Sequence, residues 1–129
     1  MIRVLIADDS AFMRKLLSDV FEEDKDFVVV DTARNGQDAV EKVKRLKPDL
    51  VTMDVEMPVM DGLTATKEIR SIKREDVAQI PIIAMTANAF EEDKRDAIAA
   101  GMDGHIVKPI QVDKLLSMLA EMIRQQETH

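Results

Sequence analysis

Short runs of aliphatic residues alternate along this chain with segments in which apolar residues recur at helical spacing. The runs are predicted to be strands, and they cover residues 2–7, 27–30, 50–54, 80–86 and 104–109. Valine, isoleucine and leucine follow one another in these runs, which is typical of strands covered on both faces. Strand and helix alternate along the whole chain. We therefore expect an α/β protein with a five-stranded parallel sheet in the order 2-1-3-4-5, a flavodoxin-like doubly wound fold.

The segments between the strands carry the signals of five helices. Ser10 is a good N-cap for the first helix, in which two apolar stripes, one with Phe12 and one with Met13, lie side by side. One of these stripes should face the core, and the pattern does not say which. The other helices are expected near residues 39–46, 63–72, 90–100 and 112–124, with Gly101 as a C-terminal cap. We expect a loop at 73–78 and a frayed end at 125–129.

The composition limits the classes of function. The chain has 129 residues, so residues 1–129 are expected to form a single domain. Acidic residues outnumber basic ones by 25 to 18, and the net charge of −7 argues against nucleic-acid binding. The absence of cysteine excludes a disulfide framework and a thiolate metal site. The first apolar run is too short for a signal peptide, and no run approaches the roughly 20 residues of a membrane span, so we expect a soluble, cytoplasmic protein with no membrane contact.

Polar side chains stand where four of the predicted strands end. Asp8 and Asp9 follow the first strand, and Asp54 ends the third. Thr86 ends the fourth, and Lys108 lies at the end of the fifth. Because parallel strands end at the same edge, these groups should meet at the rim where open α/β sheets bind ligands. Taken alone, Asp54 could equally well be a turn former or a reactive group. The charged and polar residues expected beside it at the rim favour a reactive group.

The chemistry of these groups indicates a metal ion and a phosphoryl group. Three deprotonated carboxylates repel one another and need a cation, and Mg²⁺ suits a partial carboxylate site that keeps waters. Lys108 and Thr86 indicate that an anionic group also binds at the rim. A carboxylate can attack phosphorus to form an acyl phosphate, while a metal and a lysine offset the charge on the transferring oxygens.

The strand-end motifs resemble those of the receiver domains of bacterial two-component response regulators. The match covers essentially the whole chain and rests on Asp8-Asp9, Asp54, Met57-Pro58, Asp61-Gly62, Thr86-Ala87 and Lys108-Pro109. The resemblance implies that Asp54 accepts a phosphoryl group from a histidine kinase or phosphotransfer protein. It implies no catalysis beyond the chain's own phosphorylation and dephosphorylation.

The resemblance also assigns roles to the neighbours of Asp54. It implies that Mg²⁺ is held by carboxylates and by one backbone carbonyl, the ligands being Asp8, Asp9, Asp54 and Glu56 (through its carbonyl). Lys108 would bind a phosphoryl oxygen, and Thr86 would move toward the phosphate as a switch. The Lys108–Pro109 bond is expected to be cis. Glu56 and Asn88 lie where receivers tune the lifetime of the phosphoryl group.

Two features depart from the usual receiver pattern. Receivers usually carry tyrosine or phenylalanine three residues before the lysine, where this chain has His105. Two interpretations fit: a half-exposed polar side chain without a switching role, or an imidazole that acts as the switch with pH sensitivity near ~6.5. In addition, residues 1–65 resemble the receivers of chemotaxis methylesterases, whereas residues 80–110 resemble those of hybrid sensor kinases. Family drift and a recombined chimera both fit this mixture.

Partner surfaces are predicted from the same resemblance. The stripe with Met13 would help to dock the phosphoryl donor. Phe90 and Pro109 lie on the face that receivers use for partners, although Phe90 is interpreted first as half-buried core. Because the chain ends just after the last helix, we expect output through an unknown downstream protein or a dimer, the chain itself being a monomer or weak dimer.

Other functions fit the sequence less well. An aspartyl phosphatase of the haloacid dehalogenase type would need Asp-x-Asp after the first strand and a cap, whereas this chain has adjacent acids and no cap segment. An FMN binder would need a phosphate loop rich in serine, threonine or glycine and stacking aromatics, and this chain has neither tryptophan nor tyrosine. An engineered or recombined receiver scaffold, with an inherited site and no natural signalling role, remains the open alternative.

Overall fold

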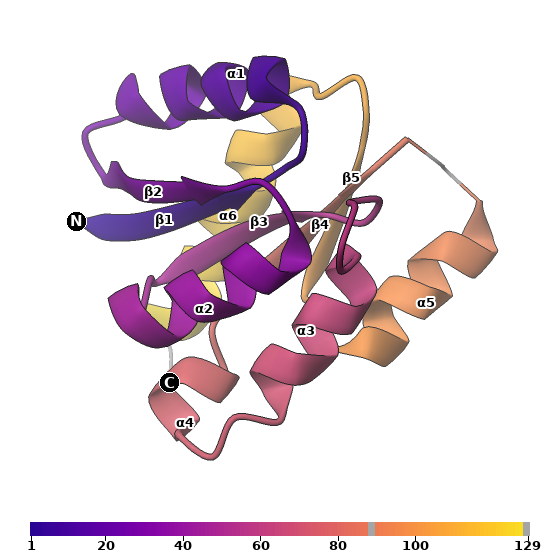
Figure 1. The fold of residues 1–129 in the computed structure, drawn as a ribbon. Helices are drawn as coiled ribbons and strands as arrows, with labels where there is room; N and C mark the ends of the chain where they lie inside the picture. Colours follow the sequence, from indigo (N-terminus) through magenta and orange to yellow (C-terminus); the bar gives the residue numbers. More distant parts are fainter. Residues whose placement is uncertain (88–89, 128–129) are drawn as a thin grey trace.

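The computed structural model describes residues 1–87 and 90–127. One parallel sheet with the order β2-β1-β3-β4-β5 runs through its centre, which confirms the predicted fold class (Figure 1). Its strands are β1 (Ile2–Ala7), β2 (Phe27–Ala33), β3 (Leu50–Asp54), β4 (Ile82–Thr86) and β5 (Gly104–Val107). All four neighbouring pairs are parallel, so the carboxyl ends of the strands lie along one edge.

Helices cover both faces of the sheet (Figure 1). The helix α1 (Ala11–Glu22) and the last helix α6 (Val112–Glu127) pack on one face, and α2 (Gly36–Leu46), α3 (Gly62–Arg70) and α5 (Glu91–Ala100) pack on the other. Successive residues of a strand point to opposite faces, so Met53 belongs to the core under α2 and α3, whereas Leu50 belongs to the core under α1 and α6. Every residue of β3 and β4 is buried, which explains their uninterrupted apolar sequences.

Side-chain caps fix where three helices begin. Ser10 accepts a hydrogen bond from the backbone N–H of the third residue of α1, as predicted. Asn35 and Asp61 do the same for α2 and α3. Each cap satisfies an N–H that has no partner within its helix. Asn35 therefore starts α2 three residues ahead of the helical spacing that the sequence shows from residue 39.

Of the two apolar stripes on α1, the one with Met13 faces the core. Leu17 and Phe21 are buried, and Met13 is partly buried against the same core. Phe12 lies on the other side and keeps 75% of its surface exposed. The exposed apolar residue at the start of α1 is therefore Phe12.

Several predicted boundaries were wrong. The segment predicted as a loop at 73–78 contains a one-turn helix, α4 (Glu75–Ala78), because Val77 is buried in the core there. The fourth strand begins after Pro81, at Ile82. β2 continues to Ala33, paired with β1, and α6 continues to Glu127, past the predicted start of fraying. Phe90 precedes α5 and is 73% exposed, so its interpretation as half-buried core was also wrong.

Arg70 ties together the edge of the sheet opposite the carboxyl ends. Its guanidinium donates to the carbonyls of Ala78 and Ile80 at 2.8 and 2.7 Å, and to that of Gly101 at 2.9 Å. It also pairs with Asp103 at 2.8 Å, and the Asp103 carboxylate in turn accepts from the backbone N–H that begins β4. The end of α3, the approach to β4 and the turn before β5 are thus held by one side chain.

The described part of the chain contains no helix that is both long enough and apolar enough to cross a membrane.

Candidate functional site

The carboxyl ends of the strands bring the predicted polar residues together. Carboxylate oxygens of Asp8, Asp9 and Asp54 lie within 4.8 Å of one another. The ammonium of Lys108 lies 3.1 Å from an oxygen of Asp8 and 3.3 Å from an oxygen of Asp54. Thr86, at the end of the neighbouring strand, is buried at the same edge. β2, which ends without such a charged group, lies at the outer edge of the sheet as expected.

Backbone contacts hold Asp8 in place. Its N–H donates to the carbonyl of Ala33 at the end of β2, and its Oδ1 accepts from the N–H of Ser10 at 2.9 Å. Arg14, one turn into α1, donates to the Asp8 carbonyl at 2.9 Å. The buried carboxylate therefore has a fixed orientation before any ligand binds. Sequence reasoning missed the contribution of Arg14, because no local signal marks a helical arginine that turns back to the preceding loop.

The 55–61 loop that follows Asp54 is closed at both ends by backbone hydrogen bonds. The N–H of Val55 donates to the carbonyl of Met85, and the N–H of Gly62 donates to the carbonyl of Val55, each at 2.9 Å. A side chain at Gly62 would place its Cβ 2.2 Å from the Asp54 carbonyl oxygen, so only glycine permits this closure. Within the loop, Val59 has a φ of 68° and is 84% exposed.

A second glycine joins the 55–61 loop to α2. The N–H of Gly36 donates to the carbonyl of Met60 at 2.8 Å. A Cβ at Gly36 would come within 2.3 Å of the same carbonyl oxygen. The loop therefore rests directly on the start of α2.

Asp54 is poised to gain or lose a proton near neutral pH. Burial raises its pKa, and the charge of Asp8 raises it further. Lys108 and a 3.3 Å hydrogen bond from the backbone N–H of Glu56 to Oδ1 act in the opposite direction. The balance places the pKa of Asp54 at about 7, against an ordinary value of 3.8.

Lys108 is held as a cation by the acids that it faces. Partial burial acts to lower its pKa, but the hydrogen bond to Asp8 and the charge of Asp54 outweigh this effect, so the pKa of Lys108 is raised. Its backbone N–H donates to the carbonyl of Thr86 at 2.7 Å, just beyond the end of β5. The bond from Lys108 to Pro109 is cis, as predicted.

The acidic residues fit a magnesium ion. Their oxygens are hard ligands and lie within 4.8 Å of one another, so at most a small inward movement would place them about 2.1 Å from a common centre. Asp9 is exposed, which leaves one side of the cluster open to water. The assignment of the Glu56 carbonyl as a further ligand stays a prediction.

The remaining predicted residues lie away from this cluster. His105 is half-buried on β5, and its pKa is lowered by burial and by Lys94, with Asp93 acting in the opposite direction. Pro109 is exposed. Asn88 lies outside the described residues. Whether His105 takes part in switching stays a prediction, as do the docking roles of Met13, Phe90 and Pro109.

Comparison with known proteins gives one consistent result. The family model for the response regulator receiver domain matches residues 4–120. The chemotaxis protein CheY of Bacillus subtilis is 48% identical over 117 residues, which cover 91% of this chain and 93% of CheY. A protein-glutamate methylesterase/protein-glutamine glutaminase of Halalkalibacterium halodurans is 41% identical over 127 residues.

The matched region covers 95% of this chain but only 36% of the methylesterase, so the chain spans about a third of that enzyme's length. Among solved structures, the CheX-CheY-BeF3-Mg²⁺ complex from Borrelia burgdorferi contains a chain that matches with a TM-score of 0.85 and 34% identity. That match covers 95% of this chain and 89% of the other.

Proposed function

Because the chain belongs to the response regulator receiver domain family, we propose that it is a signalling switch that is phosphorylated on Asp54 in the presence of Mg²⁺. The observation that carries the proposal is the placement of the Lys108 ammonium within 3.3 Å of both Asp8 and Asp54, beside a third carboxylate. A turn former at residue 54 would need none of these partners.

Asp54 is the nucleophile in this proposal. Its pKa of about 7 leaves a substantial deprotonated fraction at neutral pH. One carboxylate oxygen attacks the phosphorus of a phosphohistidine on the donor protein. The new oxygen–phosphorus bond forms as the phosphorus–nitrogen bond breaks, and the imidazole leaves with the electron pair. Attack of water on the same phosphorus later releases inorganic phosphate and restores the carboxylate.

The neighbouring residues position and neutralise the transferring group. Asp8 and Asp9, with Asp54, would hold Mg²⁺, which supplies positive charge to the phosphoryl oxygens when it is bound. The ammonium of Lys108 already lies beside Asp54, and it would bind a phosphoryl oxygen once the phosphoryl group is attached. Thr86, buried one strand away, would move its hydroxyl toward the phosphate and so begin the conformational response.

The CheX-CheY-BeF3-Mg²⁺ complex supports the metal and the phosphoryl chemistry of the proposal, because a chain similar to this one occurs there with Mg²⁺ and a beryllofluoride. We propose a histidine kinase or phosphotransfer protein as donor. The output would be a downstream protein or a dimer, through a shift between two existing conformations.

Phosphorylation by acetyl phosphate tests the proposal directly. With Mg²⁺, the intact chain should gain the mass of one phosphoryl group, and Asp54→Asn should gain none. Asp61→Asn is the matched control, since Asp61 is an exposed cap of α3 and asparagine caps helices equally well. An intact chain that gains no mass, or an Asp54→Asn variant that still gains it, would contradict the assignment.

A second experiment separates a natural switch from an inherited scaffold. The chain would be mixed with a panel of phosphorylated histidine kinases and phosphotransfer proteins, and transfer would be followed as phosphate lost from each donor. Rapid transfer from one donor supports a signalling role. A chain that reacts with acetyl phosphate but with no protein donor would favour the scaffold alternative.

A further inference from the structure

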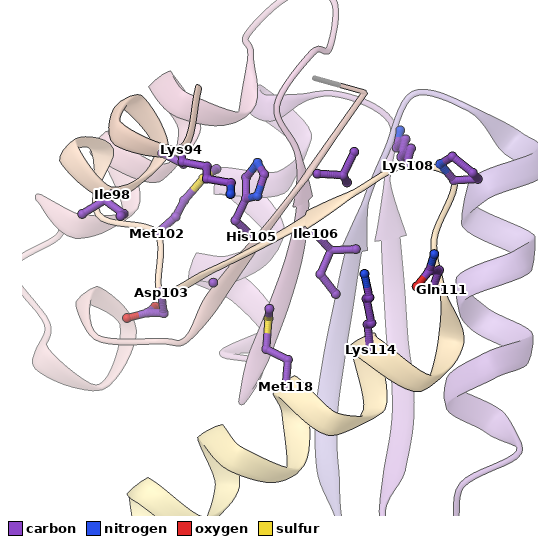
Figure 2. A pocket seen from close by; sticks show the side chains of 14 residues that line it. Lys94, Ile98, Met102, Asp103, His105, Ile106, Lys108, Gln111, Lys114 and Met118 are labelled. Carbon is purple, nitrogen blue, oxygen red and sulfur yellow. The ribbon is translucent and has the colours of Figure 1, made fainter. Parts of the chain in front are cut away.

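His105 stands in a groove of about 610 Å³ between α5 and α6 (Figure 2). It lies opposite Ala84 in the β4–β5 ladder, and Thr86 follows two residues later on the same face of the sheet. Ala84 contributes only a methyl group beside the ring. Val107 lies opposite Thr86 itself, and His105, one pair earlier on the same face, carries the one ring on β5 that borders the space Thr86 would leave on moving toward Asp54.

The imidazole has no acceptor for a second proton in its present position. Its Nε2 is buried and has no hydrogen-bond partner among the described residues. A neutral imidazole has one unprotonated nitrogen, so its buried Nε2 need not carry an N–H that lacks an acceptor. A protonated ring would carry two N–H donors and a full charge, and burying a charged donor without a partner is costly.

The charged groups around the groove do not offset such a charge. On α5, Lys94 lies beside the ring and opposes its protonation, while Asp93 favours it (Figure 2). Lys114 lines the groove from α6, and Lys108 and Asp103 line it at the two ends of β5. On β4 the residue facing His105 is the uncharged Ala84. The lysines therefore outnumber the acids that surround the ring.

We propose that His105 makes activation of this protein dependent on pH, because only the neutral ring can move further from water, toward the space that is left when Thr86 moves to the phosphoryl group. This inference rests on the proposed function. Acid would favour a protonated ring, whose second N–H needs water or another acceptor, and it would therefore oppose the activated conformation, in which the ring is further from water. By linkage, activation must lower the pKa of His105.

Titration of the histidines by NMR tests this reciprocity. The chain contains two histidines, and the other is the terminal His129, so His105→Phe assigns the signals. The pKa of His105 would be measured with Mg²⁺ alone and with Mg²⁺ plus beryllofluoride. We expect beryllofluoride to lower the pKa of His105 by at least about 0.3, which corresponds to a loss of beryllofluoride affinity that approaches twofold well below that pKa.

A binding measurement removes the contribution of Asp54, which titrates in the same range. Beryllofluoride affinity would be measured at about pH 6 and about pH 8 for the intact chain, His105→Phe and His105→Gln. All three proteins keep Asp54, so only the additional loss in the intact chain reports on His105. We expect that additional loss to be measurable and at most about twofold, relative to both variants, because the ring is only partly protonated at about pH 6.

The outcomes separate this inference from the proposed function. If beryllofluoride shifts the Asp54 amide signal but leaves the pKa of His105 unchanged or raised, the pH dependence is overturned and the phosphorylation site stands. Equal pH dependence in the intact chain and both variants has the same meaning. If beryllofluoride does not bind to the intact chain, both the inference and the proposed function are overturned.

Discussion

Replacing Asp54 with asparagine should stabilise the metal-free protein, and the gain should grow with pH. The pKa of Asp54 is about 7 in the folded protein, against an ordinary value of 3.8. The folded state therefore binds this proton more tightly than the unfolded state does. Stability linked to Asp54 is fully present below about pH 4 and is lost as the pH rises through about 7.

The size of the effect follows from the pKa difference. A shift of roughly three units corresponds to about 4 kcal/mol of unfolding free energy once the pH exceeds 7. Asparagine removes the charge but does not reproduce the hydrogen bonding of a protonated carboxyl group. We therefore expect a net gain of about 2–4 kcal/mol at about pH 8, and little gain at about pH 4.

Urea denaturation in EDTA at several pH values measures this gain. The difference in unfolding free energy between Asp54→Asn and the intact chain should increase steadily from acid to alkaline pH. Asp61→Asn makes the same chemical change at an exposed helix cap and should give a difference that does not vary in this way. A gain for Asp54→Asn that is the same at every pH, or a loss at about pH 8, would refute the reasoning.

Three further predictions concern other parts of the molecule. Arg70→Met should cost about 2–4 kcal/mol of unfolding free energy in urea denaturation, because it leaves three carbonyls, from two distant segments, without their charged donor. Arg124→Met, at an exposed ion pair on α6, should cost far less, and equal costs would contradict the role of Arg70. Val59→Gly should increase the unfolding free energy by about 1 kcal/mol in the same assay, because it removes the backbone strain of a β-branched residue with a φ of 68°. A loss of stability would contradict this prediction. Mg²⁺ should bind about fivefold more weakly at pH 6 than at pH 7, because it displaces the proton of Asp54, and calorimetry in two buffers should detect proton release at pH 7. An affinity that does not change with pH would contradict this prediction.

The sequence was sufficient for the sheet order and for the members of the acidic site. Both follow from a simple rule: in a parallel sheet the strands end together, so residues that end strands become neighbours. Asp8, Asp54 and Lys108 are far apart in the chain and meet for this reason alone. The cis bond before Pro109 also followed, from resemblance to a family.

What the sequence did not provide depends on contacts between distant segments. The one-turn helix at 75–78 exists because Val77 reaches the core, which no local pattern in a charged stretch reveals. Arg70 looks like one of several exposed helix charges, and its partners come from segments that only the fold assembles. Phe90 has the apolar character of a core residue, yet its place before α5 directs it to solvent.

The closure of the 55–61 loop separates two kinds of sequence change. Three backbone hydrogen bonds fix the loop at Val55, Met60 and Gly62, and they join main-chain atoms only. Pro58 and Val59 are among the exposed residues between these hydrogen bonds, and their side chains can therefore be exchanged without disturbing the sheet beneath. A residue inserted between 58 and 60 would disrupt the turn that the Met60 N–H closes on the Pro58 carbonyl at 2.7 Å. Variation that suits the rim to new partners should therefore arise here by exchange of residues at constant length.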